Sequence, residues 1–352
     1  MSPSREALRV LVVSGQGGPW RAGLVKAIQA DRDTLLVGHV DPGEASATVL
    51  TERPDIVSLD MAGLDAGGEA AALVRGMLAH GPVPILLLVP PGQRRDASMA
   101  ALVAGAVEVM TSPARWDLLS GSELCRRLHA LSHLSLQRRE RLRERERARH
   151  GSTPTAAGGA ARGSADGVVG LAASTGGPPA LARVLGGLGG LPRPVAVVQH
   201  LQSGFVDGFL TWMRRESALP VELATDGAIL KPGVALVVPP GLHGFVRRHR
   251  LTLRDEPVTL HRPSADVLFH SMAEQCGSSG IGVILTGMGD DGAAGLLALR
   301  RAGGITIAQD EVSSAVYGMP RAAHDLGAVN RVLPLSDISA EVLRASGVPV
   351  AA

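Results

Sequence analysis

The sequence predicts an α/β protein with two doubly wound parallel-sheet domains joined by a charged linker. Short apolar runs alternate with helical patterns five times between residues 8 and 131, and the alternation resumes at residue 168. An Arg/Glu-rich stretch and then a Gly/Ala/Ser-rich stretch separate the two regions. We therefore expect a first domain over residues 1–134, a linker over 135–166 and a second domain over 167–348.

The first region has the period of repeated strand–helix units. Each apolar run is four to six residues long and ends at turn-forming residues, as buried parallel strands do. We expect strands over residues 8–13, 35–39, 55–59, 84–89 and 107–110. The helical patterns between and after them cover residues 20–30, 44–52, 68–80, 95–104 and 117–131. Strands that alternate with helices in this way predict a parallel sheet covered on both faces.

The linker begins with a run of alternating charges over residues 138–149. Glu140, Glu144 and Glu146 each stand three residues before an arginine, a spacing that supports a solvated helical extension. A basic docking arm is the alternative, and the interleaved acids count against it. Residues 151–167 are rich in Gly, Ala, Ser and Thr and predict a flexible linker.

In the second region, polar segments follow three apolar runs. Ser174 follows residues 168–173, His200 follows 195–199, and Gly287-Met-Gly-Asp-Asp-Gly292 follows 281–286. A further apolar run covers 234–238. Functional groups in parallel α/β sheets lie beyond the carboxyl ends of the strands, so these three segments are expected at one edge.

Ser174 lies in a Gly-rich turn between a strand and a helix, and three interpretations of that position are open. A serine at such a junction can cap the helix, the glycines can cradle a phosphate, or the hydroxyl can act as a nucleophile. A nucleophilic serine needs a base and an acceptor that orients the base. His200 and Asp291 supply these at neighbouring strand ends, and His243, after Pro239-Pro-Gly, is the competing base.

Composition excludes several classes of function. The formal net charge is +2 and aromatic residues are 2% of the chain, which argues against a nucleic-acid partner. Cys125 and Cys276 are far apart and predict packing residues, with neither a disulfide framework nor a metal site. No apolar run reaches the length of a membrane span, and the first residues lack the layout of a signal peptide. These features predict a cytoplasmic protein without direct membrane insertion.

Several motifs of the second region resemble the chemotaxis protein-glutamate methylesterase family (CheB). They are Gly170-Leu-Ala-Ala-Ser-Thr-Gly-Gly-Pro178, Val198-Gln-His-Leu201, Lys231-Pro-Gly233, Arg262-Pro-Ser-Ala-Asp-Val-Leu-Phe269, residues 285–295 and residues 308–323. The resemblance implies a Rossmann-like methylesterase domain, with Ser174, His200 and Asp291 as its catalytic triad. It also implies an oxyanion hole that includes the Met288 backbone N–H, and it places Thr175 near the imidazole.

The resemblance also implies a reaction and its partners. Members of the family hydrolyse glutamate γ-methyl esters, and deamidate glutamines, on the cytoplasmic region of methyl-accepting chemotaxis receptors. The expected enzyme is a serine esterase that needs no metal and no organic cofactor. A chemotaxis histidine kinase is a possible further partner.

The first domain resembles the family's flavodoxin-like response-regulator receiver, but its chemistry departs from that pattern. Arg53-Pro-Asp-Ile-Val-Ser-Leu-Asp60 matches the strand that ends at the phosphoacceptor. Ser14-Gly15 replace the acidic pair that holds Mg²⁺, Val89-Pro90 occupy the switch-hydroxyl position, and Ser112-Pro113 replace Lys-Pro. The loop after Asp60 is also about two residues short. Phosphoryl transfer to a carboxylate relies on a cation, so we expect Asp60 to be a poor acceptor in a degenerate receiver.

Two other functions compete with the esterase. A nucleotide-binding transferase would use residues 170–177 as a phosphate cradle and Asp290 and Asp291 as metal ligands, but the chain lacks the P-loop lysine. A non-catalytic signalling scaffold would explain the degenerate first domain, although it would not need Ser174, His200 and Asp291 together.

Overall fold

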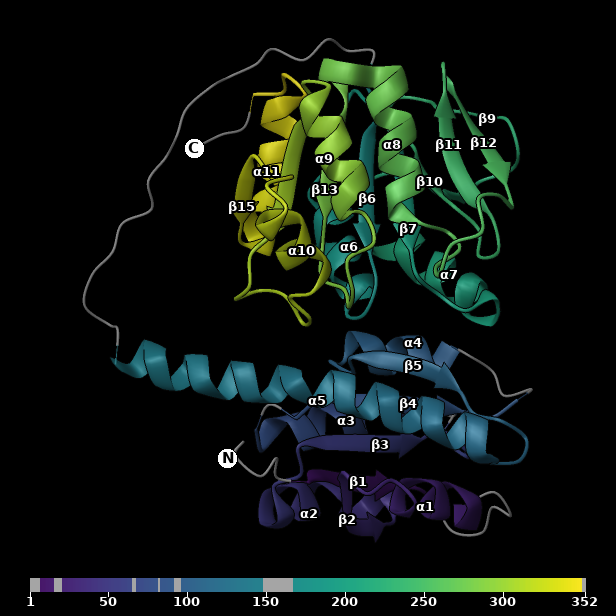
Figure 1. The fold of residues 1–352 in the computed structure, drawn as a ribbon, viewed down its shortest axis with the longest axis vertical. Helices are drawn as coiled ribbons and strands as arrows, with labels where there is room; N and C mark the ends of the chain where they lie inside the picture. Colours follow the sequence, from purple (N-terminus) through teal and green to yellow (C-terminus); the bar gives the residue numbers. More distant parts are fainter. Residues whose placement is uncertain are drawn as a thin grey trace. The chain divides into compact units, whose positions relative to one another are not determined.

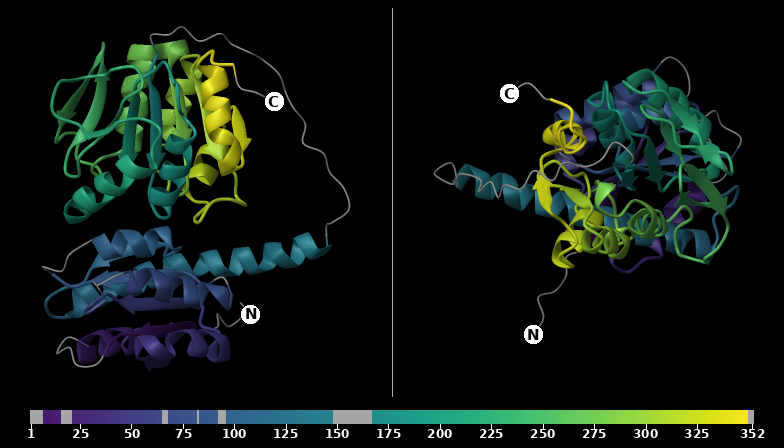
Figure 2. Two further views of the ribbon diagram at one scale, coloured as in Figure 1. Left: turned by 180° about the vertical axis from the view of Figure 1, so that it is seen from behind. Right: turned by 90° about the horizontal axis from the view of Figure 1, so that it is seen from above.

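The computed structural model describes residues 7–15, 21–64, 68–81, 83–91, 96–147 and 167–349. The chain divides into two compact units, Met1–Ala156 and Ala157–Ala352. Each unit contains one main parallel sheet with helices packed on it (Figures 1 and 2). The α/β class with two parallel sheets, expected from the alternation of strand and helix patterns, is confirmed.

The sheet of the first unit has the strand order β2-β1-β3-β4-β5, and every neighbouring pair is parallel. This is the flavodoxin-like doubly wound order. Its strands are β1 (Leu8–Val13), β2 (Thr34–Val40), β3 (Ile56–Asp60), β4 (Ile85–Val89) and β5 (Glu108–Thr111). Its helices are α1 (Arg21–Gln29), α2 (Ala45–Glu52), α3 (Glu69–Ala79), α4 (Asp96–Val103) and α5 (Leu118–Arg147), with a 3₁₀ turn, η1 (Pro42–Glu44), before α2.

Helix α5 is longer than the pattern over residues 117–131 predicts. It continues to Arg147 and takes in most of the Arg/Glu run. The helical extension predicted for that run is therefore the second half of α5. The flexible segment predicted over residues 151–167 lies outside the described residues, except for Gly167.

The main sheet of the second unit has the strand order β15-β14-β13-β6-β7-β10-β8, again parallel throughout. Its strands are β6 (Val169–Ala173), β7 (Val195–Gln199), β8 (Val221–Leu223), β10 (Ala235–Val237), β13 (Ile281–Ile284), β14 (Ile305–Gln309) and β15 (Arg331–Leu333). Without β8, the order from β10 to β15 is the Rossmann arrangement. Its switch point, where functional sites form, lies between β6 and β13.

Helices cover both faces of this sheet. Helices α8, α9 and α10 pack in one layer, and α7, α6 and α11 pack in the other (Figures 1 and 2). Their bounds are α6 (Gly177–Gly186), α7 (Val206–Glu216), α8 (Ala265–Cys276), α9 (Ala293–Arg301), α10 (Met319–Asp325) and α11 (Leu335–Ala345), with 3₁₀ turns η2 (Ser203–Phe205) and η3 (Gly277–Ser279). Among the described helices, none is long and apolar enough to cross a membrane.

A small antiparallel sheet, which the sequence patterns do not predict, lies beside helix α8. Its strand order is β11-β12-β9, from β9 (Ala228–Ile229), β11 (His243–Arg247) and β12 (Arg250–Arg254). Strand β11 contacts α8, and Val246 of β11 is buried in the same core as Phe269 and Met272 of α8. This packing fixes the loop between β12 and α8, which reaches the candidate site.

Candidate active site

Ser174 follows β6 directly, in a turn that only glycine can complete. Helix α6 begins at Gly177, and its N-cap is Gly176, with a φ of 72° in the left-handed region. A Cβ on Gly176 would lie 2.4 Å from the Cβ of Ala315, so the position excludes side chains by space as well as by conformation. The helix-cap interpretation of Ser174 is therefore wrong, and its hydroxyl is not used by α6.

Backbone contacts hold Ser174 between two neighbouring strands. The Ser174 N–H donates to the Thr286 carbonyl (3.0 Å) beyond β13, and the Ser174 carbonyl accepts from the Gly177 N–H (2.8 Å). The buried Gln199 side chain of β7 donates to the same carbonyl (2.8 Å). A Cβ on Gly287 would lie 2.8 Å from the Ser174 Cβ, so the loop after β13 packs directly on the serine.

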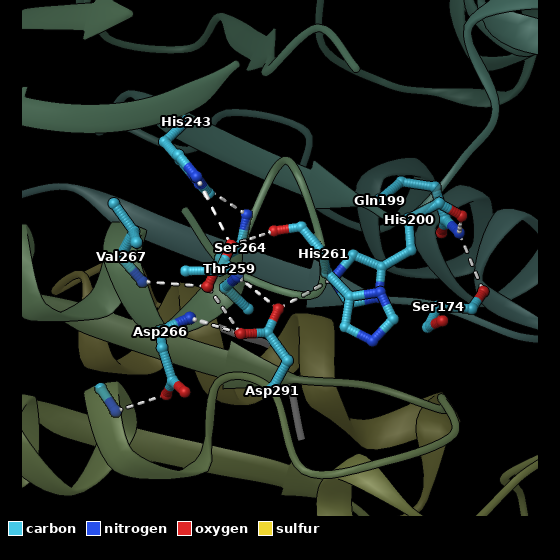
Figure 3. A network of polar contacts seen from close by, with 12 residues as sticks. Ser174, Gln199, His200, His243, Thr259, His261, Ser264, Asp266, Val267 and Asp291 are labelled. Carbon is cyan, nitrogen blue, oxygen red and sulfur yellow. Dashed lines mark hydrogen bonds and ion pairs between the residues drawn. The ribbon is translucent and has the colours of Figure 1, made fainter. Parts of the chain in front are cut away.

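His200 follows β7, as predicted, and its imidazole is polarised from one side. Its Nε2 lies 2.8 Å from Oδ2 of Asp291, and both side chains are 10% exposed. Figure 3 shows the imidazole between the Asp291 carboxylate and Ser174. Since a carboxylate only accepts, Nε2 carries a proton, and in the neutral imidazole the acceptor nitrogen is therefore Nδ1. Nδ1 is buried and has no hydrogen-bond partner in the described part of the chain, the Ser174 hydroxyl included.

Asp291 is the residue expected to orient the base, and the start of helix α8 holds its carboxylate. Oδ1 accepts from the Ser264 hydroxyl (2.7 Å) and the Asp266 N–H (3.2 Å), and Oδ2 accepts from the Ala265 N–H (2.7 Å) (Figure 3). Burial alone would raise the pKa of Asp291, but the hydrogen bond and charge of His200, then Ser264 and Ala265, outweigh it and lower the pKa to about 2. Asp291 is thus ionised at neutral pH.

His243, the competing base, is a structural residue. Its ring is fully buried, with Nε2 2.9 Å from the Pro257 carbonyl and Nδ1 accepting from the Ser264 N–H (3.1 Å). Burial, the largest cause, lowers its pKa, so the ring is neutral. Both nitrogens are used to hold the loop between β12 and α8, and none is left to take a proton from Ser174.

His261, which is not among the candidate residues of the sequence, lies against His200. Its ring is stacked on that of His200, with ring centroids 4.2 Å apart and an interplanar angle of 12° (Figure 3). Its position directly before the Arg262–Phe269 motif is the sequence signal that could have drawn attention to it.

The residues expected to support the oxyanion lie in the loop after β13 and in the Ser174 turn. The Met288 N–H makes no hydrogen bond within the described residues, while the Gly287 carbonyl accepts from the N–H groups of Gly318 (3.1 Å) and Met319 (2.8 Å). These bonds fix the loop after β13 and leave the Met288 N–H available to donate to an oxyanion. Thr175 is buried, and its carbonyl accepts from the Thr286 hydroxyl (3.0 Å).

The site does not suit the phosphate and metal chemistry of a nucleotide-binding transferase. Four donors occupy the Asp291 carboxylate, and Asp290 beside it is exposed. The described residues contain no group of three or more His, Cys, Asp or Glu side chains placed to hold a metal. In the Gly-rich turn, the Gly177 N–H is already bonded to Ser174.

In the first unit, Asp60 lies at the end of β3 and is 5% exposed. Its carboxylate accepts from the Ala62 N–H (2.9 Å), and burial, opposed in part by this bond and by the charge of Arg21, raises its pKa to about 6. Beyond the neighbouring β1, the Ser14 hydroxyl and Arg21 Nε bond to Nε2 of His39 (2.8 and 2.7 Å). Arg21 also lies 4.0 Å from Oδ1 of Asp41. A guanidinium whose charge acts on these carboxylates does not fit Mg²⁺, which takes mainly carboxylate and water oxygens.

A Rossmann-like parallel sheet with serine, histidine and aspartate at its switch point is typical of an α/β serine hydrolase. Comparison with known proteins is more specific. Residues 169–342 match the model of the CheB methylesterase family. The chain is 40% identical to protein-glutamate methylesterase/protein-glutamine glutaminase 2 of Anaeromyxobacter dehalogenans, over 94% of this chain and 95% of that protein. It is 38% identical to the protein-glutamate methylesterase FrzG of Myxococcus xanthus, over 96% and 98%.

Among solved structures, the catalytic domain of the Thermotoga maritima CheB methylesterase is 32% identical. The matched region covers 50% of this chain and 96% of the Thermotoga maritima domain, with a TM-score of 0.47. The chain belongs to the CheB methylesterase family.

Proposed function

We propose that the protein is a protein-glutamate methylesterase and protein-glutamine glutaminase, with Ser174 as its nucleophile. Its substrates are γ-methyl glutamate and selected glutamines on the cytoplasmic region of chemoreceptors. Residues 167–348 form the catalytic domain, residues 1–134 form a receiver-like regulatory domain, and the protein acts in the cytoplasm. The proposal rests on the contacts of His200: Nε2 is bonded to an ionised aspartate, and Nδ1 is buried and has no hydrogen-bond partner among the residues that the structure describes.

The first half of the reaction transfers the glutamyl group to the enzyme. The Ser174 hydroxyl turns toward Nδ1 of His200, which takes its proton as Oγ attacks the ester carbonyl; such bonds are often open in unliganded sites. Asp291 holds the tautomer of the neutral imidazole and then stabilises the imidazolium that forms. The tetrahedral oxyanion accepts from the Met288 N–H and the backbone beside Ser174, where one donor contributes about 2.7–4 kcal/mol. The imidazolium then protonates the leaving methoxide, and methanol departs.

The second half regenerates the enzyme. His200 takes a proton from a water molecule, and the resulting hydroxide attacks the glutamyl ester on Ser174. Collapse of the second tetrahedral intermediate returns the proton to Oγ and releases the glutamate side chain. Deamidation follows the same course with ammonia as the leaving group, so one site accounts for both activities.

The first domain is proposed to regulate by binding a partner, without a phosphorylation switch. Asp60 lies where the receiver's phosphoacceptor is expected, yet Ser14 stands after the neighbouring β1 in place of an acid, and the charge of Arg21 acts on Asp60. A chemotaxis histidine kinase remains a candidate partner for docking only.

Release of labelled methanol from methylated receptor membranes tests the proposed function. The wild-type protein is expected to release methanol, and Ser174→Ala to abolish the release. Ser336→Ala, which removes an exposed hydroxyl that donates to Asp337 (2.8 Å), is the matched control and is expected to keep wild-type activity. No release by the wild type would favour a transferase or a scaffold, and release unchanged by Ser174→Ala would reject the mechanism.

A further inference from the structure

The loop between β12 and α8 contacts the catalytic pair at two points. Near its end, Ser264 bonds to the Asp291 carboxylate, and three residues earlier His261 stacks on the ring of His200. The first contact orients the acid through hydrogen bonds. The second touches the base only through the face of its ring, and the mechanism above assigns it no role.

The loop that carries His261 is firmly anchored. His243 contacts the loop at the Pro257 carbonyl (2.9 Å) and at the Ser264 N–H (3.1 Å). Between these points, the Thr259 hydroxyl donates to the His261 carbonyl (2.5 Å). These contacts involve the backbone around His261, so they do not depend on its side chain. The imidazole of His261 is therefore presented on a fixed frame.

The ring of His200 needs such a support. Only Nε2 makes a hydrogen bond, to Asp291, while Nδ1 has none in the described structure. A ring held at one atom can tilt about that bond and about the bond to its Cβ, and either motion moves Nδ1 away from the serine. A parallel ring at a centroid distance of 4.2 Å blocks tilting toward it, since it lies at van der Waals contact. Its π face also stabilises the imidazolium formed during each acyl transfer.

We propose that His261 is a positioning residue, whose flat aromatic face keeps the imidazole of His200 in the plane from which Nδ1 accepts the Ser174 proton. The inference rests on the proposed function and deepens it. It assigns the role to the face of the ring, and not to a proton carried by His261.

Three variants separate these roles, with kcat and KM for methanol release as the readout. His261→Phe keeps the flat ring and loses both nitrogens, and it is expected to keep kcat within about threefold. His261→Leu keeps apolar bulk without a flat face, and His261→Ala removes the support altogether. Both are expected to lower kcat by roughly tenfold to a hundredfold with KM within about twofold, since a small misplacement of a reacting group has effects of this size.

A double-mutant cycle with Asp291→Ala, which removes the hydrogen bond to Nε2 of His200, adds a readout that a purely structural role would not move. Because both residues orient the same ring, their effects on kcat are expected to be non-additive, whereas thermal unfolding of the His261 variants stays close to wild type. An equal loss in His261→Phe and His261→Ala would overturn the inference, as would wild-type kcat in His261→Ala. Either result, with Ser174→Ala still inactive, would contradict the role of His261 and not the proposed function. A wild-type protein that releases no methanol would contradict both the role of His261 and the proposed function.

Discussion

Replacing Asp291 with asparagine removes one charge from the site. The hydrogen bonds around position 291 favour one orientation of the new amide. Oδ2 accepts from His200 and from the Ala265 N–H (2.7 Å), whereas Oδ1 accepts from the Ser264 hydroxyl and, over 3.2 Å, from the Asp266 N–H. An NH₂ group at the Oδ2 position would face the close Ala265 donor. At the Oδ1 position it can donate to the Ser264 hydroxyl, which rotates to accept. The amide oxygen thus stays on His200, and the tautomer with Nδ1 unprotonated is retained.

The expected loss of rate therefore comes from charge alone. The surroundings of Asp291 lower its pKa from the ordinary 3.8 to about 2, equivalent to about 2 kcal/mol of preference for the carboxylate, with His200 the first cause of the lowering. An imidazolium that loses this partner is destabilised by a similar amount. Since 1.36 kcal/mol corresponds to a tenfold change in rate, kcat is expected to fall between about tenfold and a hundredfold.

The assay is steady-state methanol release from methylated receptor membranes, with Asp290→Asn as the matched control. Asp290 is adjacent and exposed, and its variant is expected to keep wild-type kcat. A fall in kcat on the order of ten-thousandfold, as expected when an amide selects the wrong tautomer, would refute the reasoning from amide orientation. A change below threefold would refute the role of Asp291 itself.

Two further predictions concern Gln199 and Asp60. Gln199→Leu removes the amide that donates to the carbonyls of Ser174 and His200. The free energy of unfolding of the second domain is therefore expected to fall by about 1–3 kcal/mol in urea titrations, and kcat with it; unchanged stability would contradict this expectation. Asp60→Asn removes a carboxyl whose pKa rises from 3.8 to about 6 on folding. Above pH 6, keeping this carboxyl ionised lowers the free energy of unfolding by about 3 kcal/mol. Because the folded state binds more protons between pH 4 and 6, wild-type stability falls as pH rises through that range, and hydrogen exchange of β3 is expected to show this fall in the wild type but not in the variant. Stoichiometric labelling of the wild type by a small phosphodonor with Mg²⁺, lost in Asp60→Asn, would contradict the degenerate receiver.

That Ser174, His200 and Asp291 lie at one edge of the sheet could be predicted, because this follows from the parallel sheet alone. Ser174 and His200 come directly after apolar runs, Asp291 lies in the loop that follows a third, and parallel strands end at one edge. The strand order was not available from the patterns, since it depends on which runs pair across long stretches of chain. The structure places β6 between β7 and β13, and this order brings the three segments together.

The roles of the other histidines could not be predicted because they depend on an irregular loop. The sequence ranks His243 as the best competing base, yet both of its nitrogens are used to hold the loop before α8. His261 lies in that loop, where neither strand nor helix periodicity indicates the direction of a side chain. The turn at Ser174 was recognised, but its cap lies two residues further on, because Gly176 adopts a positive φ that serine avoids.

Covalent labelling with a serine-reactive phosphonate ester shows whether Ser174 is the residue that carries the glutamyl group between two acyl transfers. The reagent phosphonylates an activated serine and stays attached, so intact mass and peptide mapping locate it. We expect one label per wild-type chain, at Ser174, no label on Ser174→Ala, and slow labelling of His200→Gln, in which the base is lost. A label at another residue, or methanol release that continues in Ser174→Ala, would contradict the account.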